Sequence, residues 1–168
     1  MGVTTTVRDA LLTIPAGLLN PLIESYEAVL TGVPSHDWQK VDLNAGNLCE
    51  TTYTILRGHM DGHYAPSPQK PDNFPEACRE LENFPSTFPP SVRIQIPRVL
   101  VAVYEMHSNR GIGRVGGDVK PYAMDGEFLL RAVQWIVAEL VRVFHHVCVA
   151  EAQEIVETVS EKQLPVIW

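Results

Sequence analysis

Apolar and polar residues follow a helical period along most of the chain. The first clear stretch begins at Asn20, whose side chain can cap a helix, followed by Pro21, which has no backbone N–H to lose in a first turn. A longer helix is predicted from Ser35 or Asp37, either of which can cap it, to about Gly62. The core-facing stripe of this longer helix consists of Trp38, Val41, Ala45, Leu48, Thr52, Ile55 and Leu56.

Two proline-rich stretches interrupt the helical pattern. Residues 63–75 are too rich in proline for a helix or a central strand, so we predict an exposed loop there. A short helix is expected after this loop, with Ala77, Cys78 and Leu81 facing the core. A second proline cluster, residues 85–90, leads into the next apolar stretch.

Residues 92–106 are apolar, and their period is ambiguous. Residues 99–104 have the β-branched richness of a buried strand, and a strand there would favour a nucleotide-binding α/β domain. We favour a helix with Pro97 in its first turn, where the missing N–H does no harm. The core face of this helix consists of Ile96, Leu100, Val103 and Met106.

The clearest helix begins at Asp125. Its polar residues form one narrow stripe on an otherwise apolar helix, which is typical of a helix at the centre of a bundle. A shorter amphipathic helix is predicted over residues 149–162, and the apolar residues 164–168 after it predict a docking partner or a continuation beyond residue 168. The polar stripe consists of Glu127, Arg131, Gln134, Glu139, Arg142 and His145.

These elements predict an all-α fold, a bundle of about five or six helices joined by proline-rich loops, in one domain spanning residues 1–168. The composition agrees, because 45% apolar and 20% charged residues are ordinary for a globular domain. The net charge of -7 is spread along the chain, so any contact with nucleic acid must be local. Residues 1–10 lack the features of a signal peptide, and no apolar run approaches a membrane span, so we expect a cytoplasmic protein that does not enter membranes.

The cysteines and two of the histidines raise the question of a metal site. Cys49, Cys78 and Cys148 lie far apart without a Cys-x-x-Cys pair, which predicts buried thiols in a reducing compartment rather than disulfides or a zinc site. His59 and His63 have the spacing of a helical zinc site but lack its glutamate, so we interpret them as a solvated helix end. No metal or cofactor is expected.

The most unusual stretch of the chain is MHSNRGIGRVGGD, residues 106–118. Gly111, Gly113 and Gly116 have the spacing of a dinucleotide-binding turn. However, no helix opens after Gly116 to supply the backbone N–H groups that bind a pyrophosphate, which argues against a dinucleotide site. A tight turn between helices, with glycines at positive-φ positions, is the structural alternative.

Three basic residues favour a ligand site in this stretch over a simple turn. His107, Arg110 and Arg114 are concentrated where glycines leave the backbone exposed, an arrangement that suits phosphate binding by charge-assisted hydrogen bonds. Neighbouring polar and glycine residues can orient them or donate backbone N–H groups. This ligand-binding set is predicted to consist of Asn109, Gly111, Gly113 and Asp118.

Residues 107–119, HSNRGIGRVGGDV, resemble the pattern RNNRGVGHVGGDV that ends a helix in bacterial Abi-like proteins with HEPN-type helical domains. The resemblance extends to residues 44–50, 96–98, 124–125 and 138–142, and so spans most of the chain. It implies a HEPN-like helical domain in a prokaryotic defence protein of the antiviral or abortive-infection type.

The HEPN resemblance also implies a homodimer whose cleft cuts RNA without a metal. In this chemistry an imidazole moves the proton of the 2′-hydroxyl, while an arginine stabilises the charge that builds on the phosphate. His107, Arg110 and Arg114 are the catalytic candidates, but His107 stands where the family has its leading arginine and Arg114 where it has its closing histidine. Since catalysis depends on sub-ångström placement, we favour binding of RNA or another phosphate-bearing ligand over nuclease activity.

A function of a different class is a non-catalytic module that dimerises or docks to a defence effector protein through apolar surfaces, including residues 165–168. The acidic net charge modestly favours this alternative. Trp38, Trp135 and Trp168 are more typical of a core or an interface than of a base-stacking platform. The two functions differ in salt dependence, because phosphate binding weakens steeply with added salt and apolar docking does not.

Overall fold

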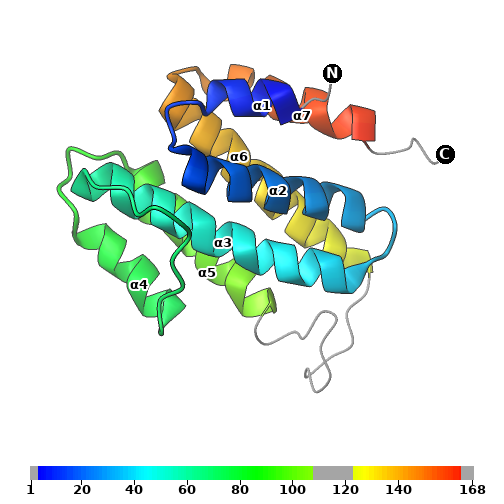
Figure 1. Cartoon of the computed structure of the whole chain (residues 1–168), viewed down its shortest axis with the longest axis horizontal. Helices are drawn as coiled ribbons and strands as arrows, with labels where there is room; N and C mark the ends of the chain where they lie inside the picture. Colours follow the sequence, from blue (N-terminus) through cyan, green and yellow to red (C-terminus); the bar gives the residue numbers. More distant parts are fainter. Residues whose placement is uncertain (1–3, 108–122, 164–168) are drawn as a thin grey trace.

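The structure is a computed structural model that describes residues 4–107 and 123–163 (Figure 1). All regular structure in these ranges is helical, which confirms the predicted all-α fold, with seven α-helices where about five or six were expected. They are α1 (Thr4–Ala10), α2 (Ala16–Gly32), α3 (Trp38–Asp61), α4 (Phe74–Glu80), α5 (Ile96–Glu105), α6 (Ala123–His145) and α7 (Val149–Gln163). A short 3-10 turn, Leu81–Asn83, follows α4, and one turn of π-helix, Ser91–Gln95, precedes α5.

Helix α6 occupies the centre of the bundle, as its pattern predicted, because it packs against α1, α2, α3, α5 and α7. In Figure 1, α1 and α7 lie together at one edge, α2 and α3 lie side by side across the middle, and α4 and α5 form the opposite edge. None of the helices in the described ranges combines the length and apolar character that a membrane-spanning helix needs.

Helix α2 begins at Ala16, so the predicted start at Asn20 and Pro21 is wrong. Pro21 lies inside the helix, where proline normally costs about 3 kcal/mol. The earlier start buries Leu18 and Leu19, and burial of each leucine contributes about 1.5–3 kcal/mol. The additional apolar burial therefore offsets the lost hydrogen bond.

Helix α1 was not predicted from the sequence. Its residues Val7 and Ala10 are buried, and Leu11 and Ile14 continue the same buried face beyond its end. This is the i, i+3, i+4, i+7 spacing of an amphipathic helix. The pattern is easily missed because α1 is only 7 residues long.

Helix α3 confirms the long helix predicted from the sequence. Of the two candidate caps, the structure selects Asp37, whose carboxylate accepts the backbone N–H of Lys40 at 3.2 Å. The helix ends at Gly62, which adopts the left-handed conformation with a φ of 84°. The predicted core stripe is buried except at Trp38, which is half-buried.

The ambiguous stretch at residues 92–106 is helical, with Pro97 in the first turn of α5 as predicted. Residues 99–104 lie within α5, so the strand that a nucleotide-binding α/β domain would require is absent there. The proline-rich loop ends at Asn73, two residues earlier than predicted, because the Asn73 side chain caps α4 and accepts the backbone N–H of Glu76. The predicted core residues Ala77, Cys78 and Leu81 are buried.

The outward face of α6 is less polar than the sequence suggested. Gln134, assigned to the polar stripe, is buried, with 7% of its surface exposed. The exposed face instead includes three large apolar residues, Met124, Phe128 and Trp135, which are 79%, 46% and 38% exposed. These three residues are spaced i, i+4 and i+11, so they share one side of the helix.

The first turns of α6 lie directly against the start of α3. A Cβ atom on Gly126 would lie only 2.3 Å from Cζ3 of Trp38, so no larger residue fits there without displacing the indole. Gly126 and Trp38 therefore hold the beginnings of the two helices together.

The cysteine prediction is correct at two of three positions. Cys49 and Cys78 are buried, and burial raises the pKa of Cys49 well above its usual value and that of Cys78 to about 12. Cys148 is exposed, so its prediction as a buried thiol is wrong. It precedes α7 in the short connection from α6, where no packed face covers it.

Candidate functional site

His107 is the member of the predicted site that the structure describes. It lies two residues beyond the end of α5. The other candidates lie outside the described residues, so their positions remain predictions. They are Asn109, Arg110, Gly111, Gly113, Arg114 and Asp118.

The His107 side chain faces a carboxylate from α3. Its Nδ1 lies 3.0 Å from Oδ1 of Asp42, and the two side chains are 22% and 9% exposed. Both atoms are buried, and neither has an aligned hydrogen bond to another described group, so the contact is a close approach of two polar atoms. Because Nδ1 is buried, the exposed part of the side chain belongs to its other atoms.

The position of the imidazole is fixed by two further contacts. A Cβ atom on Gly46 would lie 3.0 Å from Nε2 of His107, so the ring occupies the space that a side chain at this position of α3 would fill. In addition, the rings of Tyr104 and His107 lie with their centroids 5.5 Å apart. Because Gly46 has no side chain, the His107 ring can pack directly against the backbone of α3.

Glu50, one turn further along α3, is also affected by His107. Burial raises the pKa of Glu50, while the positive charges of Lys70 and His107 act in the opposite direction. Asp42, Gly46 and Glu50 are spaced four residues apart and share one face of α3. This face therefore presents two carboxylates near the histidine, one buried and one half-buried.

This arrangement has a clear chemical capacity. A carboxylate at Nδ1 orients an imidazole, and an oriented imidazole can donate a hydrogen bond to a bound oxyanion. The same pairing permits general acid–base chemistry if a substrate reaches the ring. Asp42 is thus a positioning residue that supports His107.

Asp42 was not among the site residues predicted from the sequence. It directly follows Val41 in the core stripe of α3, so a carboxylate at position 42 falls at the margin of the buried face. Buried aspartates are rarely left without a partner, and this placement was the available signal. Its partner is 65 positions away in the sequence, and no local pattern links them.

The predicted solvated helix end at His59 and His63 is half right. His63 is exposed, but His59 packs against the rings of Phe88 and Phe144, with centroids 5.8 and 5.0 Å away. Burial lowers the pKa of His59. Within the described ranges, no group of three or more histidine, cysteine, aspartate or glutamate side chains could hold a metal ion.

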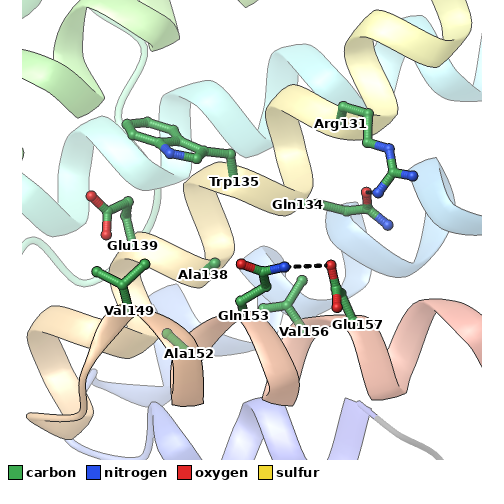
Figure 2. Close-up of a pocket in the computed structure, with 10 residues that line it drawn as sticks. All are labelled: Arg131, Gln134, Trp135, Ala138, Glu139, Val149, Ala152, Gln153, Val156 and Glu157. Atoms are coloured by element: carbon green, nitrogen blue, oxygen red, sulfur yellow. Dashed lines mark hydrogen bonds between the residues drawn. The ribbon is translucent and has the colours of Figure 1, made fainter.

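A hollow between α6 and α7 is a second surface of interest (Figure 2). It has a volume of about 240 Å³, and Trp135 and Val149 supply much of its exposed apolar surface. Polar side chains border it, among them Gln153, whose amide donates to Glu157 at 2.8 Å. The hollow adjoins the exposed apolar face of α6, because Trp135 belongs to both.

Comparison with known proteins identifies no relative of this chain. No family model matches it, and neither the curated proteins nor the solved structures include one with significant similarity.

Proposed function

We propose that this chain is a HEPN-like domain of a prokaryotic defence protein that binds RNA through its phosphates at the His107 end of α5. The observation that carries the proposal is the placement of His107 against the buried carboxylate of Asp42, at the point where the basic, glycine-containing stretch begins. The assignment to a HEPN-like lineage depends on the motif resemblance at residues 107–119.

The physical basis is electrostatic. An imidazole next to Asp42 is held in one orientation, and a protonated imidazole binds phosphate oxygens by charge-assisted hydrogen bonds. Arg110 and Arg114 follow three and seven residues after His107 in the sequence. Arginine supplies the N–H donors that phosphates prefer. Since the chain carries a net charge of -7, this local cluster is needed to overcome a general repulsion of RNA.

Binding is favoured over cleavage because the order of arginine and histidine is exchanged. His107 is only partly exposed, and its Nδ1 side is closed by Asp42. Proton transfer to RNA requires the ring to reach the 2′-hydroxyl at hydrogen-bond distance. We therefore expect an RNA-binding domain without nuclease activity.

The test measures binding of a fluorescent single-stranded RNA at several salt concentrations, with EDTA present throughout. Each phosphate contact contributes a slope of about -0.7 to the plot of log K against log salt concentration. Arg110→Ala and Arg114→Ala should each weaken binding and flatten that slope. Arg79→Ala is the matched control, because Arg79 is an exposed arginine on α4 that pairs with Glu76.

Asp42 is tested separately as a residue that positions His107, through RNA binding by single and double variants. Asp42→Asn retains the size of the side chain but removes the carboxylate that faces Nδ1 of His107. RNA binding should weaken in this variant but should not weaken further when Asp42→Asn is added to His107→Ala, a coupling that independent effects on the fold would not produce. An absence of RNA binding by the wild-type chain, or binding that is indifferent to Arg110, Arg114 and Asp42 alike, rules the proposal out.

A second candidate function is supported by the exposed apolar face of α6. Met124, Phe128 and Trp135 share one side of this helix, and large exposed apolar residues in a row are typical of interfaces. We propose a second copy of the chain as the occupant, because a two-fold dimer can bury the same patch on both partners. Light scattering should then show a dimer that persists in high salt and dissociates in a Phe128→Ser, Trp135→Ser variant, whereas a monomeric wild type would exclude it.

A further inference from the structure

A larger cavity lies at the other end of α3, between that helix and the proline-rich loop that follows it. It has a volume of about 600 Å³, within the range of small-molecule sites. Arg57, His63 and Lys70 provide its basic groups, and we call it the cationic pocket. Tyr53 of α3 and Tyr64 of the loop also line it.

The loop that forms one wall is held in place by specific contacts. The backbone N–H of Gln69 donates to Oγ1 of Thr54 at 2.9 Å, which fixes the end of the loop on α3. Near its start, a Cβ atom on Gly58 would lie 2.5 Å from Cδ1 of Tyr64, so the tyrosine lies directly against the helix backbone. The pocket is therefore formed by the fold before any ligand arrives.

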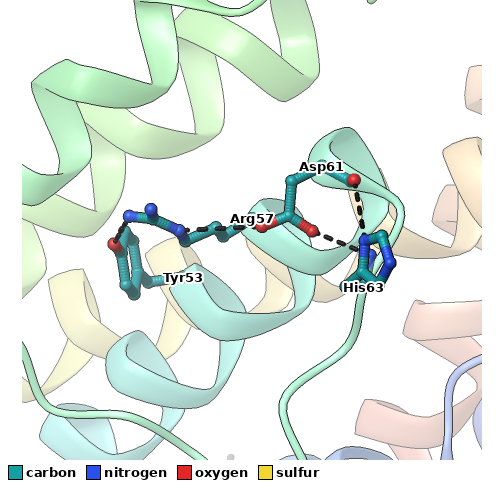
Figure 3. Close-up of polar contacts among 4 residues, drawn as sticks. All are labelled: Tyr53, Arg57, Asp61 and His63. Carbon is teal, nitrogen blue, oxygen red and sulfur yellow. Dashed lines mark hydrogen bonds and ion pairs between the residues drawn. The ribbon is translucent and has the colours of Figure 1, made fainter.

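Arg57 is only partly engaged (Figure 3). Its Nη1 donates to the hydroxyl of Tyr53 at 3.0 Å, and this hydrogen bond raises the pKa of Arg57. Its Nε lies 3.8 Å from Oδ2 of Asp61, beyond hydrogen-bond distance. The guanidinium group, whose side chain is 51% exposed, thus keeps most of its five N–H donors available.

Lys70 and His63 are the other basic residues of the cationic pocket. Lys70 makes no ion pair with another described residue. His63 is held at the end of α3, because its backbone N–H donates to Oδ1 of Asp61 at 2.8 Å. Asp61 is the acidic residue that lines the pocket. Glu80 also acts electrostatically on Arg57, and Glu50 on Lys70, so the two permanent positive charges of the lining are partly offset by carboxylates outside it.

We propose that the cationic pocket binds a small phosphomonoester with a flat or apolar body, the chemistry of a nucleoside monophosphate. Arg57 and Lys70 bind the phosphate, because a guanidinium fork and an ammonium group match its oxygens. Tyr64 and the loop prolines contact the body of the ligand. Arg57 lies eleven residues after Gly46, about 16 Å along the helix axis, so this site is separate from the one at His107.

Asp61 provides a distinctive prediction, because its carboxylate repels a phosphate bound by the neighbouring Arg57. Asp61→Asn removes this repulsion while preserving the size of the side chain. The variant should bind a phosphomonoester several-fold more tightly than the wild type does. A pair that merely stabilises the helix end would produce no such gain.

The experiment is isothermal titration of the purified chain with AMP, inorganic phosphate and adenosine. AMP should bind most tightly, inorganic phosphate more weakly and adenosine weakest. Arg57→Gln and Lys70→Gln should each weaken AMP binding roughly tenfold or more, and Arg57→Lys should weaken it less. Arg79→Gln and Lys40→Gln are matched controls, because both residues are exposed and neither lines the cationic pocket.

Each result has a defined meaning. AMP binding that is lost with Arg57→Gln but retained by a folded His107→Ala variant supports the proposal and separates it from RNA binding at His107. Circular dichroism of each variant establishes that the bundle is intact. Adenosine binding as tight as that of AMP, no saturation by any phosphate compound, or AMP binding unchanged in Arg57→Gln and Lys70→Gln overturns it.

Discussion

The two ends of α3 use charged residues in opposite ways, although both use the same face of the helix. Near its beginning, Asp42 is buried against His107, and both side chains are largely removed from solvent. Near its end, Arg57 faces an open cavity and lies 3.8 Å from Asp61, with both side chains at least one-third exposed. The spacing of residues 42, 46, 50, 53, 57 and 61 places all of them along one side of the helix.

The difference shows what burial does to a charged pair. Where water is excluded, loss of one partner of a polar contact leaves the other without solvation. Where water has access, the same type of contact contributes little and leaves its donors free for a ligand. The buried pair therefore orients a side chain, while the exposed pair leaves charge available for binding.

The largest effect on stability is expected from His107→Ala. Removal of the imidazole leaves the buried Asp42 carboxylate without its partner, at a cost of about 1–3 kcal/mol in the free energy of unfolding. Adding Asp42→Asn in the same chain should restore part of that loss. Urea denaturation of both single variants and the double variant measures the coupling between His107 and Asp42. Purely additive effects on the free energy of unfolding would show that the two side chains do not stabilise each other.

The second effect compares glycine substitutions at the two ends of α3. Gly58→Ala places a Cβ atom 2.5 Å from Cδ1 and 2.9 Å from Cα of Tyr64, so the net loss should be about 1–2 kcal/mol. Gly46→Ala approaches the His107 ring only to 3.0 Å, and the better helix propensity of alanine, about 1 kcal/mol, should nearly cancel the crowding. Thermal denaturation of the two variants distinguishes them, and an equal loss at both positions would show that the close approach of Tyr64 is unimportant.

The third effect concerns Glu50, midway between the two ends. Because burial raises its pKa in the folded state, the ionised carboxylate lowers stability at neutral pH, and that loss disappears as the pH falls through the folded-state pKa towards 4.5. Glu50→Gln should therefore raise the melting temperature at pH 7 by an amount corresponding to less than about 1 kcal/mol. The gain should vanish in acid, and a gain of equal size at every pH would assign it to something other than ionisation.

The smallest effect is expected at the exposed pair. Asp61→Asn should change the free energy of unfolding by less than about 0.5 kcal/mol, because its contact with Arg57 is long and exposed to solvent. Since salt screens exposed charges, added salt should reduce this difference further. A loss comparable to that of His107→Ala, measured by the same urea titration, would remove the distinction between the two ends of the helix.

The helical architecture followed from local signals that the sequence displays directly. The Asp37 cap, the left-handed Gly62 and the proline in the first turn of α5 are each determined by a few neighbouring residues. The start of α2 was predicted wrongly because the gain from burying Leu18 and Leu19 depends on packing partners that are distant in the sequence. Local rules thus fail where tertiary burial outweighs them.

The candidate sites were predictable only in part. The histidine of the motif was found because unusual residues are concentrated in one stretch of sequence. Its carboxylate partner Asp42 was not found, since the contact joins two helices. The cationic pocket likewise combines α3 with a loop, and nothing in the sequence indicates that Arg57 and Lys70 face one cavity. Such groupings are products of the fold rather than of sequence spacing.

The close approach of Gly126 to Trp38 has a consequence for how this protein can change. Trp38 and Asp42 are one turn apart on α3, and they hold Gly126 and His107, which lie on either side of residues 108–122. The two flanking residues, His107 and Gly126, are therefore both anchored to the same two turns of α3. A displacement of these two turns would therefore move both flanking residues together.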